Sequence, residues 1–209
     1  MSLIIQLTAL TPDTIDWLKA QRAKQFFLAE TGICEDSWVP DPPPGPGRSR
    51  MLDTVLGWIG LGRLDPDDVA DPDPVRLFDT AAGEGETEDT DKAWHGLHVC
   101  LTGQLEGGDY PLAFMDVGGH PLTRSPGYQA ARIFDPQETA EIADTLATFG
   151  EAGVRGNYDA DRMEAGQVYP EGIWHDPCSC EYVVDAFRRL LAFLQRLESR
   201  RQGFAIQLT

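Results

Sequence analysis

Residues 91–103 have the sequence DKAWHGLHVCLTG, and the spacing of their apolar side chains predicts an amphipathic helix. Trp94, Leu97 and Leu101 recur at helical intervals, and Gly103 is a residue that commonly ends a helix. A helix with one apolar stripe is stable in water only when that stripe is covered. We therefore expect this edge to be buried against a sheet built from distant parts of the chain.

Apolar runs on both sides of this helix predict the strands of the sheet. Residues 3–7 and 204–209, near the two ends of the chain, are both expected to enter the sheet, and the letters IQLT of residues 5–8 recur at residues 206–209. Residues 112–117 and 129–134 are predicted as two further strands around the turn at Gly118 and Gly119.

Further helices are predicted from their start signals and apolar periodicity. One begins at Pro12 and extends to about Leu28. A second begins after Asp135, which is followed by a first-turn proline and an acid at the capping-box position, and Gly150 is expected to close it. The last helix is the longest. Its apolar stripe consists of Val183, Phe187, Leu190, Leu191, Leu194 and Leu197.

Strands mixed with unevenly spaced helices indicate an α/β fold, here a three-layer sandwich in which helices flank a central mixed sheet. The length of 209 residues and the apolar fraction of 42% suffice for one core, so a single domain is expected over residues 1–209. A Pro-rich loop at 39–48 and an acidic loop at 65–90 are expected at its surface.

The net charge of −17 limits the partners that the chain can have. It repels nucleic-acid phosphates and anionic lipids, so we expect no nucleic acid and no membrane as partner, and a basic protein as the partner if there is one. Residues 65–91 hold eleven acids and a single base, Arg76. That run is either a solvated loop or a docking surface for a cationic partner.

Cysteine usage and hydropathy indicate the compartment. Four cysteines in 209 residues are too few for a disulfide framework, and neither a basic leader nor an apolar run of membrane-spanning length is evident. We expect a reduced, cytoplasmic protein.

Four polar residues of the predicted helix form a stripe beside its apolar edge. They are Asp91, His95, His98 and Thr102, at i, i+4, i+7 and i+11. Two histidines with a carboxylate one turn earlier can converge on a metal ion or place a base against a substrate. The alternative is structural, with Asp91 capping the helix and His98 a hydrogen-bonded histidine of the core.

A second group is a weaker candidate for a metal site. It comprises His175, Cys178 and Cys180. His95 or His98 would have to complete a tetrahedral zinc site, and the Cys-x-Cys spacing lacks the usual gap of two to four residues. A bend at Pro177 before a helix explains the segment without metal. No cofactor is therefore expected, and no nucleophile elbow or dinucleotide fingerprint anchors an enzyme assignment.

The motif at residues 91–98, followed by Leu101-Thr102-Gly103, resembles the signature of the bacterial YfbM-like proteins, a family of unknown function. The similarity continues through Gly118-Gly119, Gly127-Tyr128, Ala131-Arg132, Tyr169-Pro170, Trp174 and the last helix. The resemblance implies an α/β sandwich of the YfbM type, present as a single cytoplasmic domain, with no established activity to transfer. If the motif marks a site, the candidate pocket consists of Asp91, Lys92, Trp94, His95, His98 and Arg132.

Two functional hypotheses follow. The acidity, without a recognisable catalytic constellation, favours a protein-binding or regulatory module that neutralises a basic partner, as immunity proteins do for cationic toxins. The alternative is a small-molecule or metal-dependent enzyme that uses the helix face of His95 and His98.

Overall fold

The computed structural model describes residues 3–20, 79–121 and 131–208. All of them belong to one compact unit, Met1–Ile33 with Asp79–Thr209, and residues 34–78, grouped apart from it, are not described. The Pro-rich loop predicted at 39–48 and residues 65–78 of the predicted acidic loop thus lie outside the described residues. The single-domain assignment stays a prediction.

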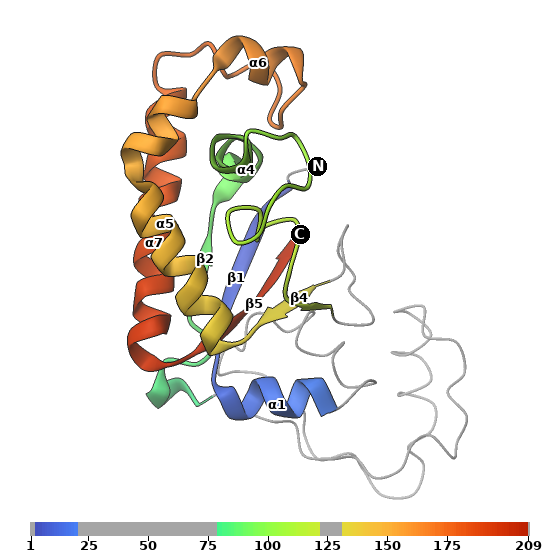
Figure 1. Ribbon diagram of the computed structural model, residues 1–209, viewed down its shortest axis with the longest axis vertical. Helices are drawn as coiled ribbons and strands as arrows, with labels where there is room; N and C mark the ends of the chain where they lie inside the picture. The colour runs from blue at the N-terminus through green and yellow to red at the C-terminus, as the bar shows by residue number, and fades with distance from the viewer. Residues whose placement is uncertain (1–2, 21–78, 122–130, 209) are drawn as a thin grey trace, which may run out of the picture. The chain divides into compact units, whose positions relative to one another are not determined.

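Five strands form one sheet in the order β2-β1-β5-β4-β3 (Figure 1). They are β1 (Ile5–Leu10), β2 (Thr87–Asp89), β3 (His120–Pro121), β4 (Arg132–Phe134) and β5 (Gly203–Leu208). The α/β class predicted from the sequence is confirmed, and both ends of the chain enter the sheet as expected.

The prediction of a mixed sheet is wrong, because every strand pair in the described part of the chain is antiparallel. The reason lies in the connection between β4 and β5. Helix α5 (Pro136–Asn157) leads away from β4, and helix α7 (Ser179–Arg200), packed beside it and of the same length of 22 residues, leads back before β5 begins. A pair of equal helices returns the chain to the end of the sheet that it left, so the next strand runs in the opposite direction.

The pairing of β1 with β5 forms the centre of the sheet, from Ile5 opposite Leu208 to Leu10 opposite Gly203. Directly opposite residues share a face, so alternate positions of the two strands build one apolar surface. Its members are Ile5, Leu7, Ala9, Phe204, Ile206 and Leu208, all buried in the main core. Helices α5 and α7 cover this face, and the interior side of α7 is the apolar stripe that the sequence predicts.

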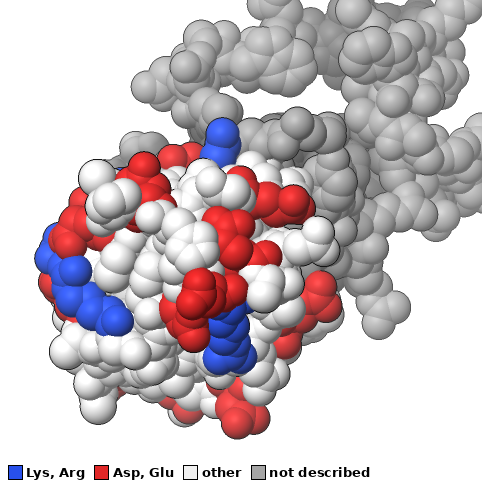
Figure 2. Space-filling model, turned by 90° about the horizontal axis from the view of Figure 1, so that it is seen from above, with Lys and Arg blue, Asp and Glu red and all other residues white. Residues whose placement is uncertain are grey.

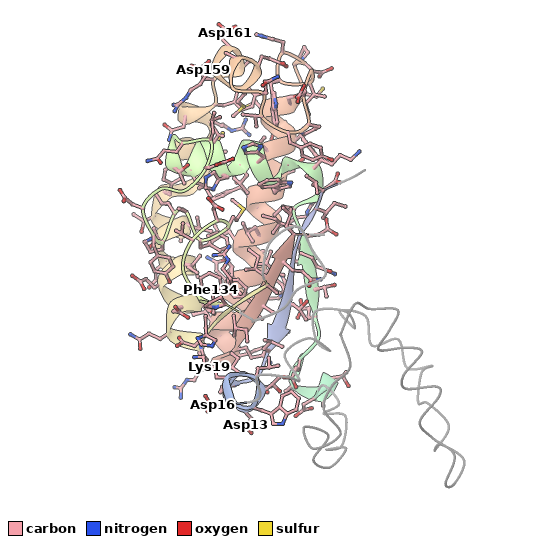
Figure 3. The ribbon with its side chains drawn as sticks, turned by 90° about the vertical axis from the view of Figure 1, so that its right-hand side faces the viewer. Asp13, Asp16, Lys19, Phe134, Asp159 and Asp161 are labelled. Atoms are coloured by element: carbon pink, nitrogen blue, oxygen red, sulfur yellow. The ribbon has the colours of Figure 1, made fainter. Side chains whose placement is uncertain are left out.

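Helix α1 (Pro12–Ala20) contacts the sheet where β5 begins. Ile15, which is buried, approaches Gly203 so closely that a Cβ there would lie 2.5 Å from its Cδ1 atom. Figure 3 shows Asp13 and Asp16 of α1 at the end of the described unit that lies opposite Asp159 and Asp161. The layer of helices α5 and α7 on the sheet agrees with the α/β sandwich expected from the sequence.

Helix α4 (Trp94–Thr102), which follows the 3-10 turn η3 (Asp91–Ala93), confirms the predicted helix. Gly103 ends it in the left-handed conformation, with its N–H bonded to the carbonyl of Val99. Leu97 and Leu101 are buried as expected. Their partners differ from the prediction, because α4 packs chiefly on α5 and α7, which already occupy the face of the sheet.

The structure differs from two other local predictions. Residues 112–117 form consecutive turns in place of a strand, with Phe114 N–H bonded to the Pro111 carbonyl and Val117 N–H to the Ala113 carbonyl. The run is apolar because these turns fold back onto the core, where Phe114 lies beside Phe134 and Phe204. Helix α5 begins with the predicted capping box, but its course only breaks at Gly150 (φ 65°) and then resumes to Asn157.

The short helix α6 (Ala160–Ala165) leads to Trp174, the side chain that positions α4. Trp174 is 1% exposed and donates its indole N–H to the Val168 carbonyl at 2.8 Å. Its ring lies directly against Gly96, where a Cβ would stand 2.3 Å from a ring carbon. Only glycine permits this approach of helix and ring.

Gly96→Ala is therefore expected to destabilise the protein by about 1–3 kcal/mol, because the added methyl group forces either α4 or Trp174 to move. Gly156→Ala is the matched control: it lies in α5 with no atom within 4 Å of its Cβ position. That exchange should be neutral or raise stability by about 0.5–1 kcal/mol. Urea denaturation compares the two variants, and equal stabilities for both would contradict the assigned contact.

Candidate functional site

A cavity of about 210 Å³ lies where β1 begins and β5 ends, under the N-terminal half of α4. Its apolar wall consists of Ile5, Leu105, Met115 and Leu208. Its aromatic and polar wall consists of Trp94, His95, His98, Glu106 and Asp116. Ile5 and Leu208 are direct neighbours in the sheet, so the cavity is built on the central strand pair.

His98 is the buried polar group of this cavity, with 2% of its surface exposed. Among the described residues, neither ring nitrogen has a hydrogen-bond partner. The carbonyl of Gly107 approaches the ring outside good hydrogen-bonding geometry and can satisfy at most one of the two nitrogens. His98 thus lies in the core, as the structural alternative expects, but no well-formed hydrogen bond to its ring is found among the described residues.

Burial also sets the charge of His98. Loss of water around the ring lowers the pKa of His98 below its ordinary value, and the nearby His95 adds to that effect. The carboxylates of Asp116 and Glu106 act in the opposite direction without reversing it. The imidazole is thus held neutral. A neutral ring has one donor nitrogen and one acceptor nitrogen, and neither has a well-formed hydrogen-bond partner among the described residues.

His95, by contrast, has both ring nitrogens engaged with the backbone. Its Nδ1 accepts the N–H of Tyr169 at 3.0 Å, and its Nε2 lies 3.0 Å from the carbonyl of Leu105. Since Nδ1 is the acceptor, the proton of the neutral ring belongs on Nε2, which donates to that carbonyl. His95 thereby ties two loops to α4 and leaves no nitrogen for a metal ion or a substrate.

Trp94 completes the aromatic wall. Its ring stacks on His95 with centroids 4.9 Å apart and lies 6.4 Å from the ring of Tyr169. The indole N–H donates to the carbonyl of Leu3 at 3.2 Å, which fixes the ring against the start of the chain. What Trp94 offers to the cavity is therefore aromatic surface.

Asp116 and Arg132 hold the loop that closes the cavity. Asp116 accepts the N–H of Gly107, and Arg132 donates to the carbonyls of Met115 at 2.6 Å and Gly118 at 3.1 Å. Burial lowers the pKa of Arg132, and the charge of Asp116 opposes this. Arg132, a candidate from the sequence, does not line the cavity; it positions the loop that does.

Asp91 and Lys92 lie apart from the cavity. The carboxylate of Asp91 accepts the hydroxyl proton of Tyr182 at 2.9 Å, which joins η3 to α7. The predicted cap is wrong, since Asp91 itself belongs to η3 at φ 46° and no side chain caps α4. Lys92 is exposed.

The second candidate group also stays apart from this cavity. His175 lies 3.4 Å from a carboxylate oxygen of Asp161 at the surface, and the Cys178 N–H is bonded to the side chain of Asp176. Cys178 and Cys180 are free thiols. Across residues 3–20, 79–121 and 131–208, no three His, Cys, Asp or Glu side chains are grouped as metal ligands would be.

Sequence reasoning identified three residues of the cavity, Trp94, His95 and His98, and missed the rest. Glu106 and Asp116 belong to the loop after α4, part of which was predicted as a strand. The polar turn residues at 104–109 indicated a loop, but nothing in their spacing indicated that it folds back over the helix.

Comparisons with known proteins agree on the family and the fold. The family description "Domain of unknown function (DUF1877)" matches residues 1–206. The crystal structure of YfbM from Escherichia coli, a protein of unknown function, is similar over 99% of both chains, with a TM-score of 0.57 and 14% identity. No curated protein matches the chain. In the described part of the chain, no helix has the length and hydropathy needed to cross a membrane.

His98→Leu is expected to raise the free energy of unfolding by about 1–2 kcal/mol at pH 7.5, because an apolar side chain of similar size removes two unsatisfied buried polar atoms. The wild type should also lose stability as the pH falls below 6.5. In that range His98 binds a proton in the unfolded chain, whereas its lowered pKa keeps it unprotonated in the folded protein. The variant lacks this loss.

Urea denaturation of both proteins at pH 7.5 and 5.5 measures the two effects. A variant that is less stable than the wild type at both pH values would contradict the assignment of His98 as an unsatisfied neutral group.

Proposed function

We propose that this chain, which belongs to the DUF1877 family, binds a small molecule in the cavity around His98. The observation that carries the proposal is the buried imidazole without a hydrogen-bond partner among the described residues. Leaving a buried polar group unsatisfied costs about 1–3 kcal/mol, and a ligand that bonds to the ring recovers that cost. Exceptions of this kind concentrate at functional sites.

The size and setting of the cavity support the same role. A volume of about 210 Å³ lies between a cavity of about 150 Å³ that holds benzene and the roughly 300 Å³ of the smallest sites for drug-sized ligands. A molecule on the order of six to ten non-hydrogen atoms suits it. The helix and two strand ends that form the wall give it a rigid frame.

Binding is better supported than catalysis. The enzyme alternative needs His95 and His98 to face one substrate, and both nitrogens of His95 are bonded to the backbone.

We infer a cytoplasmic location in a bacterial cell, supported by Cys100, Cys178 and Cys180, which are free thiols.

Titration with a set of neutral and charged compounds of six to ten non-hydrogen atoms tests the proposal by NMR. Compounds that bind should shift both the indole N–H signal of Trp94 and the ring signals of His98, since both side chains line the cavity. His98→Leu should weaken binding at least ten-fold by removing the polar anchor. Thr148→Ala, at an exposed site on α5, is the matched control and should bind as the wild type does.

A complete compound set that leaves both signals in place would refute the proposal. So would equal affinities of wild type and His98→Leu for a compound that does bind.

A second candidate is the protein-binding or regulatory role suggested by the acidity. Figure 2 views the end of the described unit that carries α6 and shows acidic groups across this face with few basic ones. Asp161 of α6, and Glu171 and Asp176 of the segment between α6 and α7, are exposed. Nearby cations are already engaged, with Arg155 in an ion pair with Glu181 and Arg162 bonded to the carbonyl of Gly103. This supports an acidic docking face for a basic protein.

Neutralising that face in the triple variant Asp161→Asn, Glu171→Gln and Asp176→Asn tests the second role. A basic protein captured at low salt from a bacterial lysate, and then purified, should bind the triple variant at least ten-fold more weakly, because its charge partners are removed. The control variant neutralises Asp13, Asp16 and Asp144, which are exposed elsewhere. An equal loss in both variants would indicate attraction by net charge alone and count against a specific face.

A further inference from the structure

The groups that face the cavity favour a positively charged ligand. Two carboxylates, Glu106 and Asp116, line it, and the described residues place no basic side chain on its wall. Arg132 does not line the cavity; its charge interacts with that of Asp116, and its guanidinium is bonded to the carbonyls of Met115 and Gly118. The charge of Glu106 therefore has no such counterpart on the wall.

His98 supplies a second and independent requirement. Its ring is neutral, 2% exposed and without a partner in the described part of the chain, so one of its nitrogens is a free acceptor. An ammonium group has three donors and no acceptor. It can donate to the imidazole and to carboxylate oxygens at the same time, which a carboxylate or phosphate ligand cannot do.

The remaining wall suits the carbon skeleton of such a molecule. Trp94 offers an aromatic surface, which attracts an organic cation as well as apolar carbon. Leu105, Met115 and Leu208 cover the rest with apolar atoms. A metal ion does not suit this arrangement, because the described residues bring no three ligand side chains together and much of the wall is apolar.

We propose that the ligand is a small organic amine, bound as its ammonium ion between His98, Glu106 and Asp116, with its hydrocarbon part against Trp94. This inference rests on the proposed small-molecule function and narrows it to one chemical class.

Three probes of nearly equal shape test the ligand class: cyclohexylammonium chloride, cyclohexanol and sodium cyclohexanecarboxylate. Each is titrated at pH 7 into the wild-type protein, with the signals of Trp94 and His98 as readout. The ammonium ion should bind at least ten-fold more tightly than the alcohol, and the carboxylate should bind most weakly. Raising the salt concentration should weaken the ammonium complex and leave the alcohol complex unchanged.

Charge-removing variants inside and outside the cavity test whether its carboxylates bind the ammonium group. Glu106→Gln changes an exposed side chain and should reduce ammonium affinity about three- to ten-fold, with a smaller effect on alcohol binding. Asp116→Asn should have a similar effect, since an amide oxygen can still accept the Gly107 N–H that Asp116 accepts. Asp144→Asn on α5 removes the same charge outside the cavity and should change nothing.

The outcomes distinguish the two proposals. Alcohol binding as tight as ammonium binding, or tighter carboxylate binding, overturns the amine assignment and leaves the small-molecule site standing. If the salt dependence and Glu106→Gln show no effect on ammonium affinity, the charge argument fails. If none of the three probes moves the Trp94 and His98 signals, the amine is rejected, and the broader compound set decides whether the site itself is rejected.

Discussion

The contact between the ring of Trp174 and the bare backbone of Gly96 determines where helix α4 lies. Trp174 is itself fixed from three sides: its N–H is bonded to Glu164, its carbonyl accepts the hydroxyl of Tyr158 and its indole donates to Val168. The end of α5, helix α6 and the loop before α7 thereby act on a single position of α4. Any residue with a Cβ at position 96 would displace either Trp174 or the helix that carries both histidines.

The position of α4 explains the two roles of its histidines. His95 begins the helix beside Trp94, where its nitrogens meet the backbone of Tyr169 and Leu105, so it joins the surrounding loops to the helix. His98 lies one turn further, on the side that faces the core, and its ring enters the cavity without a backbone partner among the described residues. The two histidines, three positions apart, thus differ in their bonding: the nitrogens of His95 have backbone partners, and those of His98 have none among the described residues.

Much of the fold was predictable because local signals and global packing agree. The capping box at Asp135, the apolar stripe of α7 and the repeated letters at the two chain ends all appear in the structure as expected. The strand directions and the path of residues 112–117 were not predictable, because they depend on how α5 and α7 return the chain and on which apolar run folds back onto Phe134 and Phe204. The site was half predictable for the same reason. The periodicity of apolar residues predicts α4, whereas Glu106 and Asp116 line the cavity only because the loop after α4 folds back over it.

Buried polar groups elsewhere show that this protein can satisfy such groups in its interior. Glu84 is 3% exposed, yet its carboxylate accepts hydrogen bonds from Thr11 and Asp79. Among the described residues, the remaining buried side-chain atoms without a partner belong to Thr90, Tyr110 and Gln202, and none of these residues lines the cavity. His98 differs because its unpartnered nitrogens lie at the wall of the cavity. The contact between Gly96 and Trp174 opposes a shift of α4 that would relieve this cost, so the unpartnered imidazole is a consequence of how the helix is held.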